Sequence, residues 1–223
     1  MNKFWKDHWE SQKDRLNKLF QKTYAETQDK KFVYCIGDCF VEGVGTENEP
    51  GMDFPNQLQG LLGDKYKIVN LGLTMLQMRV LSSTFSEFFA ERIKSGNVVV
   101  ILCSSNDFFF EVLVNEVFDW YANFCKLLGI NSKIIAMTLL PRSAGTPKNF
   151  EINRLAFNGL LRERHLEFCD GLADLAADNL IGYAGAEGNA LYYCQFSGNN
   201  THPNGTGYGI IAKIVYDEIM KIA

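Results

Sequence analysis

Five short apolar runs, separated by longer stretches in which apolar residues recur at helical spacing, constrain the fold of this chain most strongly. The runs lack strict alternation of apolar and polar residues, as expected for strands buried on both faces of a parallel sheet. Repeated strand–helix alternation predicts an α/β fold, a three-layer α/β/α sandwich. The predicted strands are Phe32–Ile36, Lys67–Leu71, Val98–Cys103, Lys133–Thr138 and Leu166–Cys169.

Helical patterns fill most of the chain between and after these runs. Two segments, Pro141–Asn149 and Ile181–Asn200, fit neither pattern and are rich in Gly, Ala, Ser and Asn. The second is long for a structureless connection in a compact domain, so we expect a functional loop beside the site. The predicted helices are Phe54–Leu62, Arg79–Lys94, Phe109–Leu128, Glu151–Arg164 and about Gly207–Ile222.

Residues 1–31 form an amphipathic helical pattern that precedes the alternating part of the chain, residues 32–223. Trp5, Trp9 and Phe20 are among the apolar residues that recur at helical spacing here. We expect this helix to pack on the domain that follows. The same face could instead contact a second copy, so a homo-oligomer stays open.

Composition and charge narrow the class of protein. The 223 residues carry a formal net charge of -4, which gives no basic footprint for nucleic acid. We find no apolar stretch long enough to span a bilayer and no apolar core of a signal peptide, so a cytoplasmic location is expected. The six cysteines show no disulfide framework, and the three histidines make a metal site improbable.

Reactive side chains follow the ends of the predicted strands. Cys39 comes directly after the first strand, and Asn106 follows the third. The carboxyl ends of parallel strands meet at one edge of the sheet, where open α/β sheets bind their ligands. His202 precedes the last predicted helix and could act as base for a Cys39 nucleophile. The Asn106 amide and the Cys39 backbone N–H could hold an oxyanion, which completes the groups needed for acyl transfer.

At these residues the sequence resembles the GDSL/SGNH hydrolase family over about residues 32–220. The matching blocks are Ile36-Gly37-Asp38-Cys39, Ser105-Asn106-Asp107 and residues 199–208, which contain His202-Pro203-Asn204. The resemblance implies a flavodoxin-like sheet of five parallel strands and no metal or organic cofactor. It also implies ester or thioester hydrolysis, or transfer of the acyl group.

The sequence departs from the family pattern at four positions. Cys39 replaces the nucleophilic serine, and Asn199 replaces the aspartate three residues before the histidine. Met75 stands where the family has a glycine whose N–H helps bind the oxyanion, and Ser104 replaces the glycine that opens the third block.

The first two departures are chemically matched. A neighbouring imidazolium or helix N-terminus can lower the pKa of a thiol, so a cysteine needs less help from a carboxylate than a serine does. Asparagine orients the catalytic histidine of papain-like proteases, and Asn199 could orient His202 in the same way. Asp38, Asp107 and Gly72, at the strand ends, are predicted to support the site.

The sequence therefore predicts an acyl-transfer enzyme, that is an esterase, thioesterase or acyltransferase, acting on a small or carrier-bound ester or thioester. Cys39 would form a thioester, which is more reactive than an ester toward amines and thiols, and this favours transfer over plain hydrolysis. Two alternatives stay open. One is a binding protein that kept the fold and lost turnover, which Met75 favours. The other is an engineered Ser→Cys substitution, which Asn199 and Met75 disfavour.

Overall fold

A five-stranded parallel sheet forms the centre of the protein, in a computed structural model that describes residues 3–27, 29–142, 145–195 and 200–222, with side chains from residue 6 onward. The strand order β2-β1-β3-β4-β5 makes β1 and β3 central, and every pair is parallel. This confirms the predicted flavodoxin-like sheet. The strands are β1 (Lys31–Gly37), β2 (Tyr66–Gly72), β3 (Val98–Leu102), β4 (Lys133–Met137) and β5 (Gly171–Ala173).

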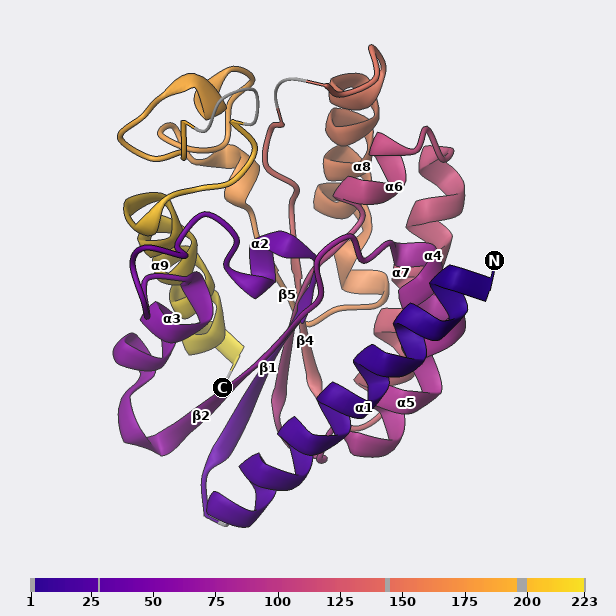
Figure 1. Cartoon of the computed structure of the whole chain (residues 1–223), viewed down its shortest axis with the longest axis vertical. Helices are drawn as coiled ribbons and strands as arrows, with labels where there is room; N and C mark the ends of the chain where they lie inside the picture. The colour runs from indigo at the N-terminus through magenta and orange to yellow at the C-terminus, as the bar shows by residue number, and fades with distance from the viewer. Residues whose placement is uncertain (1–2, 28, 143–144, 196–199, 223) are drawn as a thin grey trace.

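Helices cover both faces of the sheet and complete the predicted sandwich (Figure 1). Helices α3 (Phe54–Leu62) and α9 (Gly205–Ile222) pack on one face. The other face carries α1 (Lys3–Glu26), α5 (Ser86–Arg92), α7 (Val114–Gly129) and α8 (Phe150–Arg164). In the described part of the chain, no helix is long and apolar enough to cross a membrane.

Short helices lie in the connections, several of them at the carboxyl edge of the sheet. The predicted helix Arg79–Lys94 is divided, because a π-helical turn stands between its two α-helical parts. The predicted helix Phe109–Leu128 is also interrupted, and Glu111 in the break has φ 56°. These elements are α2 (Cys39–Glu42), α4 (Met78–Val80), the π-helix η2 (Leu81–Phe85), α6 (Ser105–Phe109), and the 3-10 turns η1 (Gly63–Lys65), η3 (His165–Glu167), η4 (Leu175–Ala177) and η5 (Ala186–Gly188).

The predicted strand Leu166–Cys169 is wrong. This segment continues α8 through a 3-10 turn, in which the Cys169 N–H donates to the His165 carbonyl at 2.7 Å. The run is apolar because the Phe168 ring packs edge-on against Phe118 of α7, with ring centroids 5.5 Å apart. Burial against a helix produced the same apolar pattern that a buried strand gives.

Helix α1 packs on the rest of the chain, as predicted. Its residues Trp9, Leu16 and Phe20 are buried, and the Phe20 ring lies 6.5 Å from that of Phe89 in α5. The side chain of Trp5 lies outside the described residues. The helix also reaches the site edge, since the Arg15 Nη2 donates to the Gly72 carbonyl at 3.1 Å.

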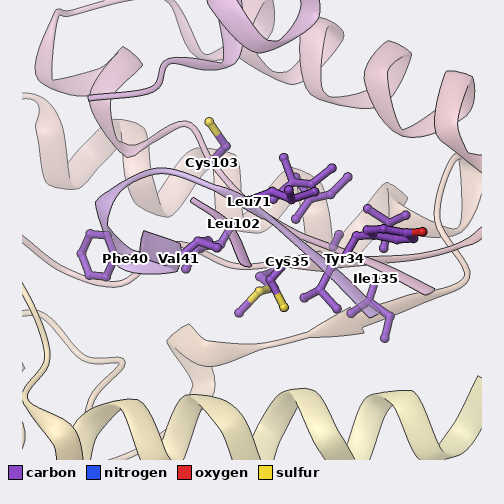
Figure 2. Packing of buried hydrophobic residues seen from close by; sticks show 14 of the residues in the cluster. Tyr34, Cys35, Phe40, Val41, Leu71, Leu102, Cys103 and Ile135 are labelled. Carbon is purple, nitrogen blue, oxygen red and sulfur yellow. The ribbon is translucent and has the colours of Figure 1, made fainter. Parts of the chain in front are cut away.

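Residues of β1, β2, β3 and β4 pack together in the hydrophobic core, as Figure 2 shows. Tyr34, Cys35 and Ile36 have no exposed surface, which is expected of a strand covered by helices on both sides. Cys35 and Cys103 are fully buried free thiols whose pKa values burial raises. This confirms that they serve as small apolar core residues.

Candidate active site

Cys39 begins helix α2 immediately after β1, which places it at the carboxyl edge of the sheet. Gly37 permits this sharp exit, because a Cβ there would lie 1.9 Å from the Leu102 carbonyl oxygen. The Asp38 Oδ1 accepts a hydrogen bond from the Phe40 N–H at 3.1 Å and caps the helix. The local sequence therefore fixes the position of the Cys39 thiol at the N-terminal end of a one-turn helix.

The loop after β2 runs beside this helix. Gly72 allows the close approach, because a Cβ there would lie 2.1 Å from the Glu42 backbone nitrogen. The Leu73 N–H donates to the Gly37 carbonyl at 2.9 Å, which ties the loop to the end of β1. Met75 has φ 63°, the left-handed conformation that glycine adopts most easily. No acceptor for the Met75 N–H lies among the described residues, so this N–H is available to a ligand.

The segment after β3 supplies the third part of the edge. Ser104 has φ 113°, which explains why the family pattern has glycine there. The Asn106 Nδ2 donates to the Leu76 carbonyl at 3.0 Å, and its second N–H remains for an oxyanion. Asp107 accepts from the Met78 N–H at 2.6 Å and so holds the far end of the loop.

His202 lies on the segment that leads into α9. The Cys194 N–H donates to the His202 carbonyl at 2.9 Å, and Tyr193 and Pro203 form an antiparallel bridge. The imidazole is buried against Phe40, the neighbour of Cys39, with ring centroids 5.3 Å apart. The fold therefore brings His202 to the helix that begins with Cys39.

The thiol and the imidazole are both neutral in this resting structure. Burial, with the Asp38 charge adding to it, raises the pKa of Cys39 far above its ordinary value. Burial and the Arg142 charge lower the pKa of His202 to about 4. The expected lowering of the thiol pKa is thus wrong for this state, because desolvation outweighs the nearby charges. Within the described residues the His202 Nε2 has no hydrogen-bond partner, so no thiol–imidazole hydrogen bond is formed here.

Unpartnered polar atoms gather at this edge. Four buried side-chain atoms of the described chain lack a hydrogen-bond partner, and three of them belong to the site: Asp38 Oδ2, Ser104 Oγ and His202 Nε2. Burial raises the pKa of Asp38 to about 7. Because proteins bond nearly all buried polar groups, this concentration distinguishes the Cys39 edge from the rest of the described chain.

Arg142 also lies at this edge, although the sequence placed it only within the segment Pro141–Asn149, which fits neither a strand nor a helix pattern. Its Nη1 donates to the Asn106 Oδ1 at 3.1 Å and approaches the Ser105 Oγ at 3.4 Å. The sequence offered one signal for Arg142: it is a charged residue a few positions after the predicted strand Lys133–Thr138. Only the assembled sheet reveals that it reaches the neighbouring strand end.

The predicted site residues thus lie at one edge of the sheet: Cys39, Met75, Asn106 and His202, together with Asp38, Asp107 and Gly72. Asn199 lies outside the described residues. No three His, Cys, Asp or Glu residues of the described chain lie close enough together to hold a metal ion.

No family model matches the chain and no curated protein matches its sequence, but solved structures share its fold. A member of the lipolytic protein G-D-S-L family from Veillonella parvula aligns with TM-score 0.69 at 12% identity, over 86% of this chain and 100% of that one. A carbohydrate acetylesterase family member from Sinorhizobium meliloti aligns with TM-score 0.67 at 13% identity, over 86% of this chain and 98% of that one. TesA aligns with TM-score 0.67 at 15% identity, over 86% of this chain and 100% of that one. The chain therefore has the fold of the GDSL/SGNH hydrolases.

Proposed function

We propose that this protein is an acyl-transfer enzyme in which Cys39 is the nucleophile and His202 the general base. One observation carries the proposal: a thiol, an imidazole whose Nε2 has no partner in the described chain, and three potential oxyanion donors share one sheet edge. The esterases among the structural relatives support an ester as the acyl donor. A cytoplasmic location and a homo-oligomeric state remain predictions.

The first step begins from a neutral pair. The His202 Nε2 takes the thiol proton as the Cys39 sulfur attacks the acyl carbonyl. The resulting oxyanion accepts hydrogen bonds from the backbone N–H groups of Cys39 and Met75 and from the Asn106 Nδ2. The leaving alkoxide or thiolate then takes the proton from the imidazolium. Asn199 is proposed to hold the His202 tautomer.

The thioester that remains on Cys39 determines the second step. A nucleophile loses its proton to His202 and attacks this thioester, which releases the Cys39 thiolate; the thiolate then recovers the proton. Amines and thiols attack thioesters more readily than water does. This chemistry favours transfer to an acceptor, or exchange with a carrier thioester, over ester hydrolysis.

A comparison of Cys39→Ser with the wild type tests the assignment. With p-nitrophenyl butyrate and butyryl-N-acetylcysteamine as donors and an added primary amine as acceptor, the wild type should form mainly amide. Cys39→Ser should form mainly free acid, because the ester enzyme is less reactive toward amines, and Cys39→Ala should form neither. Turnover by Cys39→Ala at the wild-type rate would contradict the assignment.

A second candidate is a binding protein that lost turnover. The raised pKa of Cys39 and the missing thiol–imidazole hydrogen bond favour it. Alkylation rates of the free protein separate the candidates poorly, because the resting thiol is neutral in both. A single-turnover burst of p-nitrophenol, equal to the enzyme concentration and absent in Cys39→Ala, would favour the enzyme.

A further inference from the structure

Arg142 is a charged side chain that touches the site and has no role in the proposed chemical steps. Its Nη1 donates to the Asn106 Oδ1 at 3.1 Å, while the Asn106 Nδ2 is a proposed oxyanion donor. The guanidinium also lies over the Phe109 ring, 4.8 Å from the centroid. The arginine is therefore held in place one side chain away from the expected position of the substrate carbonyl.

The charge of Arg142 is not matched by a carboxylate. Among the described residues, no acidic oxygen lies within 4.0 Å of its guanidinium, whereas Arg162 and Arg164 each make a two-pronged contact with a carboxylate. Arg142 is half-buried, so water screens its charge only in part. A half-buried arginine without an acidic partner is a ready site for an anion.

The nearby carboxyl groups of Asp38 and Asp107 do not fully neutralise the charge of Arg142. The pKa of Asp38 is about 7 because of burial, so this carboxyl is partly protonated at neutral pH. The carboxylate of Asp107 is occupied by the backbone N–H groups of Met78 and Arg79. A guanidinium has five N–H donors, and among the described residues only Nη1 of Arg142 makes hydrogen bonds, to Ser105 and Asn106. Donors remain for a two-pronged contact with a carboxylate or phosphate.

We propose that Arg142 binds an anionic group, a carboxylate or a phosphate, on the acyl substrate and so selects charged acyl donors over neutral ones. The inference rests on the proposed function, because it assigns a substrate class to the same site. The anion would sit within a short chain of the reacting carbonyl, since Asn106 contacts Arg142 and is proposed to bind the oxyanion.

Binding can be measured without turnover in the Cys39→Ala background. The probes are monomethyl succinate, its uncharged analogue dimethyl succinate, and inorganic phosphate, each followed by calorimetry. We expect monomethyl succinate to bind at least about 10-fold more tightly than the diester, the range of a charge-assisted hydrogen bond. Adding Arg142→Met should remove this preference, and Arg142→Lys should keep part of it, since lysine keeps the charge but loses the planar fork.

The matched control is Arg164→Met. Arg164 also lies over a phenylalanine ring, 5.0 Å from the Phe118 centroid, but it pairs with Glu167 on the surface. This control should keep the full preference. Tighter binding of phosphate than of monomethyl succinate would assign the site to phosphate-bearing substrates.

Equal affinity for the monoester and the diester, or an unchanged preference in Arg142→Met, would overturn the inference. If Arg142→Met does not fold, Arg142→Lys is used instead. A reduced preference of this variant for monomethyl succinate over dimethyl succinate, which weakens further as salt rises, would support the inference. If the wild type transfers no acyl group but the protein still prefers monomethyl succinate, the anion site stands and the proposed function fails. Failure of the anion site and failure of the proposed function are therefore distinguishable.

Discussion

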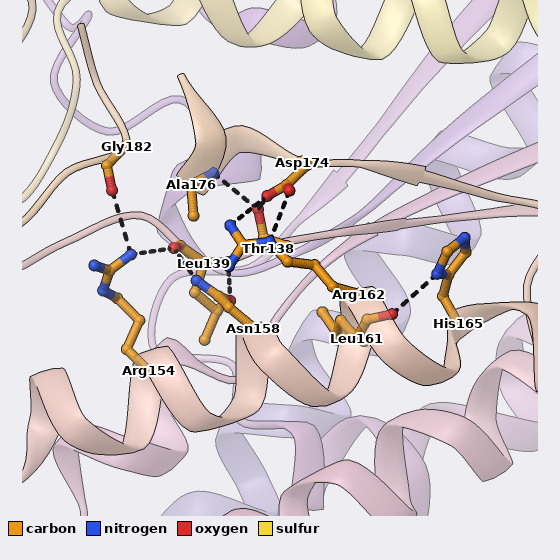
Figure 3. Close-up of polar contacts among 10 residues, drawn as sticks. All are labelled: Thr138, Leu139, Arg154, Asn158, Leu161, Arg162, His165, Asp174, Ala176 and Gly182. Carbon is orange, nitrogen blue, oxygen red and sulfur yellow. Dashed lines mark hydrogen bonds and ion pairs between the residues drawn. The ribbon is translucent and has the colours of Figure 1, made fainter. Parts of the chain in front are cut away.

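Two polar regions at the carboxyl side of the sheet differ in how their hydrogen bonds are made. Between the end of β4 and α8, the buried Arg154 of α8 donates to the Leu139 carbonyl at 2.8 Å (Figure 3). Arg154 also donates to the Glu151 carboxylate at 2.6 and 2.7 Å. The Asn158 amide exchanges two hydrogen bonds with the backbone of Leu139, at 2.8 and 2.9 Å. Every side chain of this β4–α8 network has its partners.

The site edge around Cys39 contrasts with this network. Asp38, Ser104 and His202 are buried there with unpartnered atoms, and Met75 and Ser104 have backbone conformations that suit glycine. Strain and unmade hydrogen bonds cost stability, so they persist where a function needs them. The comparison indicates that the β4–α8 network stabilises the scaffold, and it agrees with our proposal that the Cys39 edge carries the chemistry.

The largest effect should come from His202→Ala. Removing the base should lower kcat/KM by about 10³-fold or more, as loss of one member of a catalytic triad does. At neutral pH the loss of stability should be limited to the packing of the imidazole on Phe40, because the Nε2 makes no hydrogen bond in the described chain. His165→Ala is the control: this histidine caps the end of α8, with its Nδ1 3.0 Å from the Leu161 carbonyl, and its loss should leave kcat/KM unchanged. Equal kcat/KM values in the two variants would contradict a role for His202 as the base.

Arg154→Met should produce the opposite result, a loss of stability. The change leaves the Leu139 carbonyl unbonded and the Glu151 carboxylate without its partner, which should cost about 2–4 kcal/mol. Urea unfolding gives the free energy, and the activity of the remaining folded fraction should stay within a few-fold of wild type. A variant as stable as the wild type would show that the β4–α8 network is dispensable.

The pH dependence of stability sharpens the comparison further. The pKa of Asp38 is raised by burial from 3.8 to about 7, so the folded chain holds a proton that the unfolded chain has lost between pH 4 and 7. Asp38 therefore makes the free energy of unfolding fall as pH rises through this range, and Asp38→Asn should remove that fall.

Relative to wild type, Asp38→Asn should gain up to about 1.4 kcal/mol per pH unit between pH 5 and 7 in urea unfolding. His202→Ala should change the slope in the other direction. The pKa of His202 is lowered by burial from 6.5 to about 4, so the histidine makes stability rise with pH in that window. Parallel curves for the three proteins would contradict both assignments.

Met75→Gly should have the smallest effect. Glycine relieves the left-handed strain at φ 63° but loses more conformational entropy on folding, so the net change should stay within about 1 kcal/mol. The backbone N–H is retained, so kcat/KM should remain within a few-fold of wild type. A large loss of activity would show that the Met75 side chain, and not its N–H, serves the site.

The sequence predicted the scaffold better than the site. Four of the five strands lie where apolar runs predict them, because a strand buried on both faces has a distinctive composition. The fifth was misplaced because Phe168 and Cys169 are buried against a helix instead. The place of Cys39, Asn106 and His202 at the carboxyl edge of the sheet could be predicted because each follows or precedes a regular element. Arg142 and the unpartnered atoms depend on contacts between distant strand ends, which one-dimensional patterns do not contain.

The central claim is that Cys39 is the nucleophile. Intact-mass measurement after brief incubation with butyryl-N-acetylcysteamine, quenched in acid and followed by peptide mapping, tests it most directly. The account predicts one butyryl group, on the peptide that contains Cys39, which is absent in Cys39→Ala and slow to form in His202→Ala. No adduct under any acyl donor, or an adduct on another cysteine that persists in Cys39→Ala, would contradict it.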